Sequence, residues 1–156
     1  MINISIPGYR ELNLSHLVLD HNGTMAFDGI PIPGVEGLLR KLADELTVHV
    51  ITADTFGTVR EALRDFPCKV LILRTGDQQI QKKNHILALG AKSVVAIGNG
   101  RNDQLMLEEA ALGIIVNNGE GLSTEALMKA DLMTHAIHEA LELLLHPNRL
   151  VATLRS

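Results

Sequence analysis

Three short polar segments of this chain carry residue types that suit chemistry on a phosphoryl group. They are Asp20-His21-Asn22-Gly23-Thr24, Thr52-Ala53-Asp54 and Gly98-Asn99-Gly100-Arg101-Asn102-Asp103. A carboxylate can attack phosphorus and form a covalent intermediate, and carboxylate and amide oxygens are ligands that Mg²⁺ accepts. Each segment alone reads equally well as a turn, because Asp, Asn, Gly and Thr are common turn residues. Their positions in the chain decide between these interpretations.

Each polar segment directly follows a run of apolar residues. Five such runs occur, at residues 16–19, 48–51, 70–73, 94–97 and 113–116. The runs are nearly continuous rather than alternating, which is typical of strands buried on both faces of a parallel sheet. The carboxyl ends of parallel strands meet at one edge, where open α/β sheets bind their ligands. The three polar segments are therefore predicted to share one edge of a sheet.

Helical patterns fill the intervals between the runs. One helical face comprises Val35, Leu38, Leu39, Leu42 and Leu46, and a second comprises Ile137, Ala140, Leu141, Leu144 and Leu145. Further helices are expected near residues 56–65, 78–90, 103–111 and 120–129. Strands that alternate with helices predict an α/β fold, here a three-layer, doubly wound, Rossmann-like parallel sheet of about five core strands. The length predicts one domain over residues 1–156.

The two ends of the chain do not follow this alternation. Residues 1–14 contain the pair Pro7-Gly8, which favours a turn, and they are expected to form a small hairpin. Residues 147–156 are expected to form a tail, or an arm that reaches a neighbouring subunit.

The composition narrows the classes of partner. The chain has a net charge of −4, no run of Lys or Arg, no Trp, one Tyr and three Phe. Nucleic acid and anionic membranes are therefore not expected as partners. No apolar stretch reaches about 18 residues, so no membrane-spanning helix is expected. Cys68 stands alone and is expected to pack in the interior, and the absence of an internal disulfide favours a cytoplasmic location.

The order of the polar segments resembles that of the haloacid dehalogenase-like hydrolases. Within that superfamily, the chain looks like the phosphorylation domain of P-type ATPases and their small soluble relatives. Those pumps carry Asp-Lys-Thr-Gly-Thr, Thr-Gly-Asp, a Lys, and Gly-Asp-Gly-x-Asn-Asp. This chain has its three polar segments and Lys82-Lys83 in the same order, and the similarity runs from about Leu17 to Val116.

The resemblance implies an arrangement of the strands. The 16–19 strand is expected to be central, with the 94–97 and 113–116 strands on one side. The 48–51 and 70–73 strands are expected on the other side.

The resemblance also implies a role for single residues. Asp20 is the implied nucleophile, and Thr52 is the implied phosphate-binding hydroxyl, although a Thr there also suits a helix cap. A lysine offsets the charge on the phosphoryl oxygens. Lys82 stands eight residues before Gly90, in the family's spacing, and is preferred to Lys83.

A magnesium site is implied at the same place. The expected ligands are the Asp20 carboxylate, the backbone carbonyl of Asn22, and the side chains of Asn99 and Asp103. Asn99 replaces an Asp of the family pattern, so the site has one negative charge fewer.

Asn22 is a second departure from the family pattern. Superfamily phosphatases usually carry an Asp there as general acid and base, and an amide cannot transfer a proton usefully. Breakdown of an aspartyl phosphate is therefore expected to be slow, unless another group supplies the proton. His21 adjoins Asp20 and faces either the site or solvent.

Larger relatives insert a cap domain between the motifs, and here the gaps leave no room for one. Some capless relatives, the sugar-acid 8-phosphate phosphatases, form tetramers whose neighbours act as lids. A homo-oligomer that covers the site is therefore expected here, because excluding water strengthens electrostatic interactions.

These observations predict a magnesium-dependent phosphatase that acts on phosphate monoesters through an aspartyl phosphate at Asp20. The substrate is either a phosphorylated small molecule or a phosphorylated macromolecule. The alternative is a catalytically weak regulatory or binding protein that keeps the fold and accepts phosphate on Asp20. A receiver-like signalling domain also places an Asp at a strand end, but the Asn-Gly-Thr after Asp20 argues against it.

Overall fold

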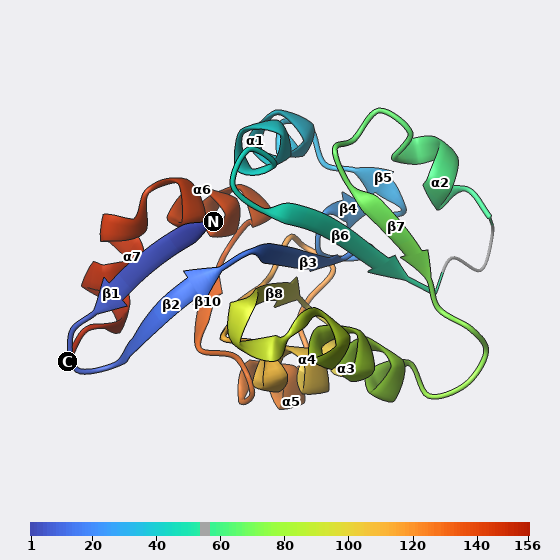
Figure 1. The fold of residues 1–156 in the computed structure, drawn as a ribbon. Coiled ribbons are helices and arrows are strands. Elements are labelled where there is room, and N and C mark those ends of the chain that lie inside the picture. The colour runs from blue at the N-terminus through green and yellow to red at the C-terminus, as the bar shows by residue number, and fades with distance from the viewer. Residues whose placement is uncertain (54–56) are drawn as a thin grey trace.

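A parallel sheet of six strands forms the centre of the computed structural model, which describes residues 1–53 and 57–156 (Figure 1). Its strands are β3 (His16–Asp20), β6 (Thr47–Thr52), β7 (Lys69–Ile72), β8 (Val94–Gly98), β9 (Leu112–Val116) and β10 (Leu132–Thr134). Their order across the sheet is β10-β9-β8-β3-β6-β7. The central position of β3 and the strands expected on each side of it are therefore confirmed. The short edge strand β10 was not expected from the sequence.

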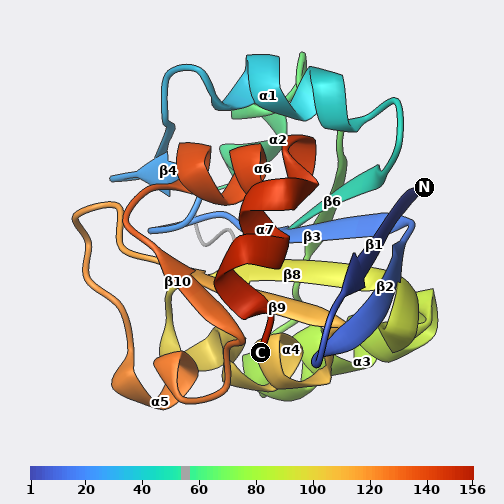
Figure 2. The same cartoon turned by 90° about the vertical axis from the view of Figure 1, so that its left-hand side faces the viewer.

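Helices cover both faces of this sheet (Figure 2). On one side lie α1 (Val35–Leu42) and α6 (Ile137–Leu145); on the other lie α3 (Gln78–Leu89), α4 (Gln104–Glu109) and α5 (Thr124–Leu127). The short helix α2 (Val59–Ala62) precedes β7. Side chains alternate between the two faces, so that Leu17 and Leu19 of β3 join one core cluster and Val18 joins the other. The predicted three-layer Rossmann-like fold is confirmed.

The N-terminal residues form the expected hairpin. Strands β1 (Ile2–Ile6) and β2 (Arg10–Leu14) pair antiparallel around a turn in which Gly8 has a φ of 74°. The buried face of the hairpin packs into the same core cluster as α6.

The C-terminal residues correct the expectation of a tail or an arm onto a neighbouring subunit. They form α7 (Pro147–Leu154), which contacts β1 of the same chain. Leu150 is fully buried, and the backbone N–H of Ser156 donates to the carbonyl of Pro7. Pro147 occupies the first helical turn, where its missing N–H has no cost, so the helix begins there.

A second small hairpin follows the central strand. It pairs β4 (Ala26–Phe27) with β5 (Ile30–Pro31). Between β3 and β6 the chain forms only this hairpin and α1, so no cap domain is inserted there. The described residues between β6 and β8 form α2, β7, α3 and a 3₁₀ turn, Ala91–Ser93.

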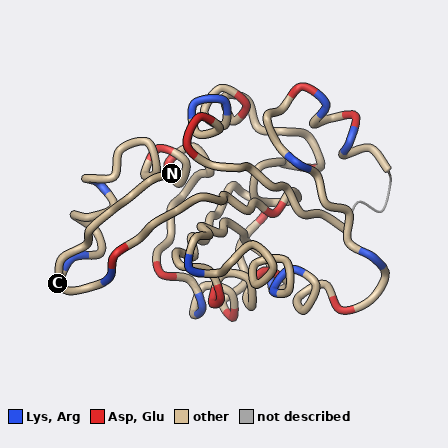
Figure 3. Tube along the Cα trace, viewed as in Figure 1, with Lys and Arg blue, Asp and Glu red and all other residues tan. Residues whose placement is uncertain are grey.

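Charged residues of both signs are interspersed along the described chain (Figure 3). Among the described residues, none of the helices is long and apolar enough to cross a bilayer.

Candidate active site

A lysine joins two buried carboxylates at the carboxyl end of the central strand. Asp20 is the last residue of β3, and its side chain is 10% exposed. The Lys82 amine, carried by α3, donates to Asp20 Oδ1 and to Asp103 Oδ1, each at 2.6 Å. The side chains of Lys82 and Asp103 are almost completely buried. One cation therefore compensates two carboxylates, of which Asp103 is fully buried and Asp20 keeps a small exposed area.

The ionisation of these groups depends on one another. Burial, and then the neighbouring charge of Asp103, raises the pKa of Asp20, whereas Lys82 lowers it, and the resulting pKa is about 6. Burial would lower the pKa of Lys82, but the charges of Asp20 and Asp103 outweigh burial and raise it. Lys82 is therefore a permanent cation, and a cation bound beside Asp20 would favour its ionised form.

The loop after β8 surrounds Asp103. The backbone N–H groups of Asn99 and Gly100 donate to Asp103 Oδ2 at 3.0 and 2.9 Å. Lys82 already occupies Oδ1, so both oxygens of this carboxylate accept from N–H donors. Gly98 permits the close approach, because a Cβ at that position would lie 2.6 Å from the Asp103 Cγ.

Thr24 connects the nucleophile loop to the loop after β8. Its hydroxyl oxygen lies 3.2 Å from Asp20 Oδ2 and 3.2 Å from Asn99 Oδ1. Gly23 has a φ of 76°, and a Cβ there would lie 2.3 Å from Asn99 Nδ2. A glycine is therefore required for both conformation and space.

Asn118, in the loop after β9, also holds the nucleophile loop. Its amide donates to the backbone carbonyl oxygens of Gly23 and Thr24, and its Oδ1 accepts from the N–H of Ile137 at the start of α6. Sequence reasoning did not single out this residue. In the sequence, the one indication of its role is that an Asn follows a buried strand, and the same pattern is found in ordinary turns.

The oxygen atoms around Asp20 are suitable ligands for a magnesium ion. Asp20 Oδ2 and Asn99 Oδ1 approach the same Thr24 hydroxyl, and Asn22 follows Asp20 by two residues on the exposed side of the loop. Within residues 1–53 and 57–156, no three His, Cys, Asp or Glu side chains gather as metal ligands. A metal here would thus rely on amide, backbone and water oxygens beside one carboxylate, a set that Mg²⁺ accepts.

The remaining predicted residues flank this centre. Thr52 ends β6, the strand next to β3, and is 2% exposed. Asp54 lies outside the described residues. Lys83 pairs with Glu109 at 3.2 Å and is partly exposed, so Lys82 is the lysine that the fold brings to Asp20.

His21 faces the interior. It is fully buried, and its Nδ1 lies 3.2 Å from Asn22 Oδ1. An amide oxygen only accepts, so the ring nitrogen donates in this bond. The bond turns the amide oxygen of Asn22 toward the ring, while the Asn22 residue itself is exposed.

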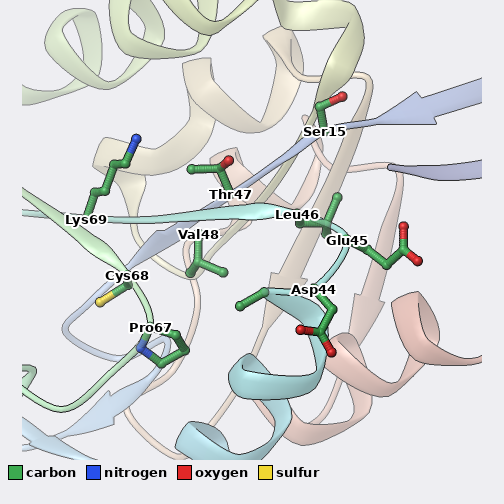
Figure 4. A pocket seen from close by; sticks show the side chains of 10 residues that line it. Ser15, Asp44, Glu45, Leu46, Thr47, Val48, Pro67, Cys68 and Lys69 are labelled. Carbon is green, nitrogen blue, oxygen red and sulfur yellow. The ribbon is translucent and has the colours of Figure 1, made fainter.

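A hollow at the amino ends of the strands, away from Asp20, lacks this cluster of buried charges (Figure 4). It has a volume of about 590 Å³ and lies beside Ser15 and Thr47, at the amino ends of β3 and β6. Lys69 lies on one side and the carboxylates of Asp44 and Glu45 on the other. The rise of a strand places this hollow on the order of 15 Å from Asp20. Burial raises the pKa of Cys68 in its wall to about 11, which fits a packing role.

The sequence of this chain is similar to that of known proteins. Residues 77–139, which include Lys82 and Asp103, match the family model of the haloacid dehalogenase-like hydrolases. An uncharacterized protein of Methanocaldococcus jannaschii is 47% identical over 64 residues, which cover 41% of this chain and 69% of that protein.

The fold is similar to solved structures. One is the 3-deoxy-D-manno-octulosonate 8-phosphate phosphatase of Moraxella catarrhalis, in complex with magnesium, phosphate and its sugar acid. It has a TM-score of 0.66 and 18% identity, and the match covers 91% of this chain and 94% of that one. Another is the cobalt-bound phosphatase of the same type from Haemophilus influenzae, with a TM-score of 0.71, 13% identity and coverages of 86% and 88%. A putative phosphatase of this type from Vibrio cholerae has a TM-score of 0.70, 18% identity and coverages of 96% and 97%.

Three findings agree on the class of this protein, which is an α/β hydrolase. They are the order of the strands in the sheet, the Asp20–Lys82–Asp103 cluster and the family match. The chain belongs to the haloacid dehalogenase-like hydrolases.

Proposed function

We propose that this protein hydrolyses phosphate monoesters through attack of Asp20 on phosphorus. The observation that carries the proposal is the position of Asp20: a buried carboxylate at the end of the central strand, paired with Lys82, which also holds Asp103. The family match, and the similarity of the fold to that of known phosphatases, support the same reaction.

The reaction has two steps. In the first, a carboxylate oxygen of Asp20 forms a bond to phosphorus, while the bond from phosphorus to the alcohol oxygen breaks and that oxygen takes a proton from water. In the second, water attacks phosphorus, the bond to Asp20 breaks, and inorganic phosphate leaves. The Lys82 ammonium is placed to offset the charge that develops on the phosphoryl oxygens. Thr52, at the end of the neighbouring strand, is the proposed hydroxyl donor to those oxygens.

Magnesium is the proposed cofactor, and it would supply positive charge beside the phosphoryl group. The proposed ligands are the Asp20 carboxylate, the backbone carbonyl of Asn22 and the Asn99 side chain. Asp103, expected from the family pattern as a further ligand, has both oxygens engaged by N–H donors. We therefore give Asp103 a positioning role, in which it fixes Lys82 and the Asn99 loop.

A screen of phosphorylated metabolites and phosphopeptides, with Mg²⁺ and with chelator, tests this function. Asp20→Asn should abolish turnover, because an amide is a poor nucleophile toward phosphorus. Acid-quenched protein should carry a phosphoryl label that hydroxylamine removes, and the Asp20→Asn variant should carry none. Full turnover by Asp20→Asn would contradict the proposal.

A second candidate function is a regulatory or binding protein that accepts phosphate on Asp20 but releases it slowly. Asn22 favours this candidate, because its amide cannot serve as the acid or base. His21 is fully buried beside it, which does not suit proton exchange with solvent. Stoichiometric labelling by acetyl phosphate without multiple turnovers would identify this second function.

A further inference from the structure

A second hollow lies at the carboxyl ends of the strands, as Asp20 does. Its volume is about 660 Å³, within the usual range for small-molecule sites. The wall comprises residues of the β4–β5 hairpin and residues of the loops that follow β9 and β10. These three segments follow the carboxyl ends of β3, β9 and β10, so the hollow belongs to the ligand-binding edge.

The hollow is connected to the nucleophile by hydrogen bonds. Asn118 lines it and donates to the backbone carbonyl of Thr24, whose hydroxyl in turn contacts the Asp20 carboxylate. On the other wall, His138 Nε2 lies 2.6 Å from the carbonyl oxygen of Pro33, which ties the β4–β5 hairpin region to α6. Both walls are therefore fixed to the scaffold that holds Asp20.

The lining is largely apolar, and the described residues that form it include no Asp, Glu, Lys or Arg. Phe27, Ile30 and Ile32 supply apolar surface, and the polar groups are amides and imidazoles, such as Asn117 and His135. An anionic group that entered this hollow would lose water without gaining a lysine or arginine partner, which is costly. An uncharged group with an apolar face and a few hydrogen-bonding edges fits this lining.

We propose that this hollow receives the leaving group of the substrate, and that this group is uncharged and partly apolar. The proposal rests on the proposed phosphatase function. It separates this chain from the structurally similar octulosonate 8-phosphate phosphatases, whose substrate is a sugar acid that carries a carboxylate as well as the phosphate.

Two phosphonates that differ in the chemistry of their tails test the proposal without requiring turnover. Phenylphosphonate has an apolar tail and phosphonoacetate has a carboxylate tail, while both present the same phosphoryl-like group. Titration calorimetry of the native protein with Mg²⁺ should show phenylphosphonate binding tighter by at least about tenfold, a factor that one well-placed apolar group can supply. Equal affinities, or tighter binding of phosphonoacetate, would overturn the proposal.

Variants of the wall supply the second arm of the experiment. Ile30 is 70% exposed, so Ile30→Ser should fold normally and weaken phenylphosphonate selectively. Met128, 81% exposed at the end of α5, gives the control Met128→Ser, which should change neither affinity. An Ile30→Ser variant that weakens both phosphonates equally, or that only changes the oligomeric state, would also overturn the proposal.

The two proposals can fail separately. Hydrolysis of esters with no preference for uncharged leaving groups would leave the phosphatase function standing and remove the inference. A preference for phenylphosphonate in a protein that hydrolyses no ester would remove the phosphatase function and keep the hollow as a ligand site.

Discussion

Lys82 is the residue on which the electrostatics of the site depend. Its replacement by Ala would leave two buried carboxylates, Asp20 and Asp103, close together without a cation. Breaking a buried ion pair by removing one partner typically costs about 3–5 kcal/mol. We expect Lys82→Ala to lower the free energy of unfolding by about 3 kcal/mol in metal-free buffer, measured by urea denaturation, and to abolish phosphatase activity.

Lys83→Ala is the matched control for this change. Lys83 is partly exposed and pairs with Glu109, so its removal should alter stability by less than about 1 kcal/mol. Similar losses of stability and activity in both variants would contradict the role given to Lys82.

Asn22 limits turnover if the protein is an enzyme without an internal acid or base. Asn22→Asp would then place a proton-transfer group two residues after the nucleophile, and such groups typically contribute about a hundredfold to ten-thousandfold. We expect kcat for phosphate monoesters to rise by at least about tenfold. The new carboxylate also repels Asp20 and changes metal affinity, so Mg²⁺ is titrated for each variant.

Asn13→Asp adds the same charge on the exposed face of β2 and should leave kcat unchanged. Fast turnover by the native protein would refute the idea that Asn22 limits the rate. Since His21 is fully buried, the proton would then come from bound water.

At the scale of elements, Asn118 joins the nucleophile loop to the start of α6. Asn118→Ala would remove its bonds to the carbonyls of Gly23 and Thr24 and leave the N–H of Ile137 without this acceptor. Unsatisfied buried groups cost about 1–3 kcal/mol each. We expect a lower melting temperature and a fall in kcat larger than the change in KM, because the loop that Asn118 holds carries Asp20. The control is Asn13→Ala on the exposed face of β2, and a change confined to KM would contradict the positioning role.

Three histidines from different elements predict how stability depends on pH. His16 Nδ1 of β3 lies 3.3 Å from His49 Nε2 of β6, and the His49 ring packs edge-on against the His85 ring of α3. Burial, followed by the positive neighbours His85, His16 and Lys69, lowers the pKa of His49 to about 4. The unfolded chain therefore binds this proton more readily than the folded protein, with a pKa near 6.5.

The contribution of His49 to the free energy of unfolding is fully present above about pH 6.5. As the pH falls toward 4, this contribution is lost, which lowers the free energy of unfolding by on the order of 2–3 kcal/mol. Denaturation between pH 7 and pH 4 should show a steeper loss for the native protein than for His49→Gln. The exposed His146→Gln variant should follow the native curve. Parallel curves for the native protein and His49→Gln would contradict this assignment.

The sequence predicted the five longer strands because each is a nearly continuous apolar run. It did not predict β10, since three residues at a sheet edge leave no such pattern. It also missed α7, where Leu150 is the one fully buried residue of a short amphipathic segment. The family's spacing favoured Lys82 over its neighbour Lys83, and the helical position of Lys82 directs its amine to Asp20. The histidine cluster could not be predicted, because its members are far apart in the chain and meet only through strand pairing and helix packing.

At the scale of the whole molecule, no cap domain is inserted between β3 and β6, where larger relatives carry one. Water exclusion strengthens the interactions of Asp20 and Lys82 with a phosphoryl group, and a neighbouring subunit could provide it. We expect a homo-oligomer at micromolar concentration by light scattering, with kcat/KM for small phosphate esters falling as dilution releases monomers.

Substrate size provides the decisive comparison for this last prediction. An oligomer that narrows the mouth of the site should hydrolyse phenyl phosphate and exclude a folded phosphoprotein. A monomer that keeps its activity on dilution leaves Asp20 open, and such a protein should accept a phosphoprotein as readily as the small ester. Measuring both substrates across the dilution series separates these cases. Activity that is independent of concentration, together with turnover of the phosphoprotein, would contradict the oligomer and identify macromolecules as the substrate class.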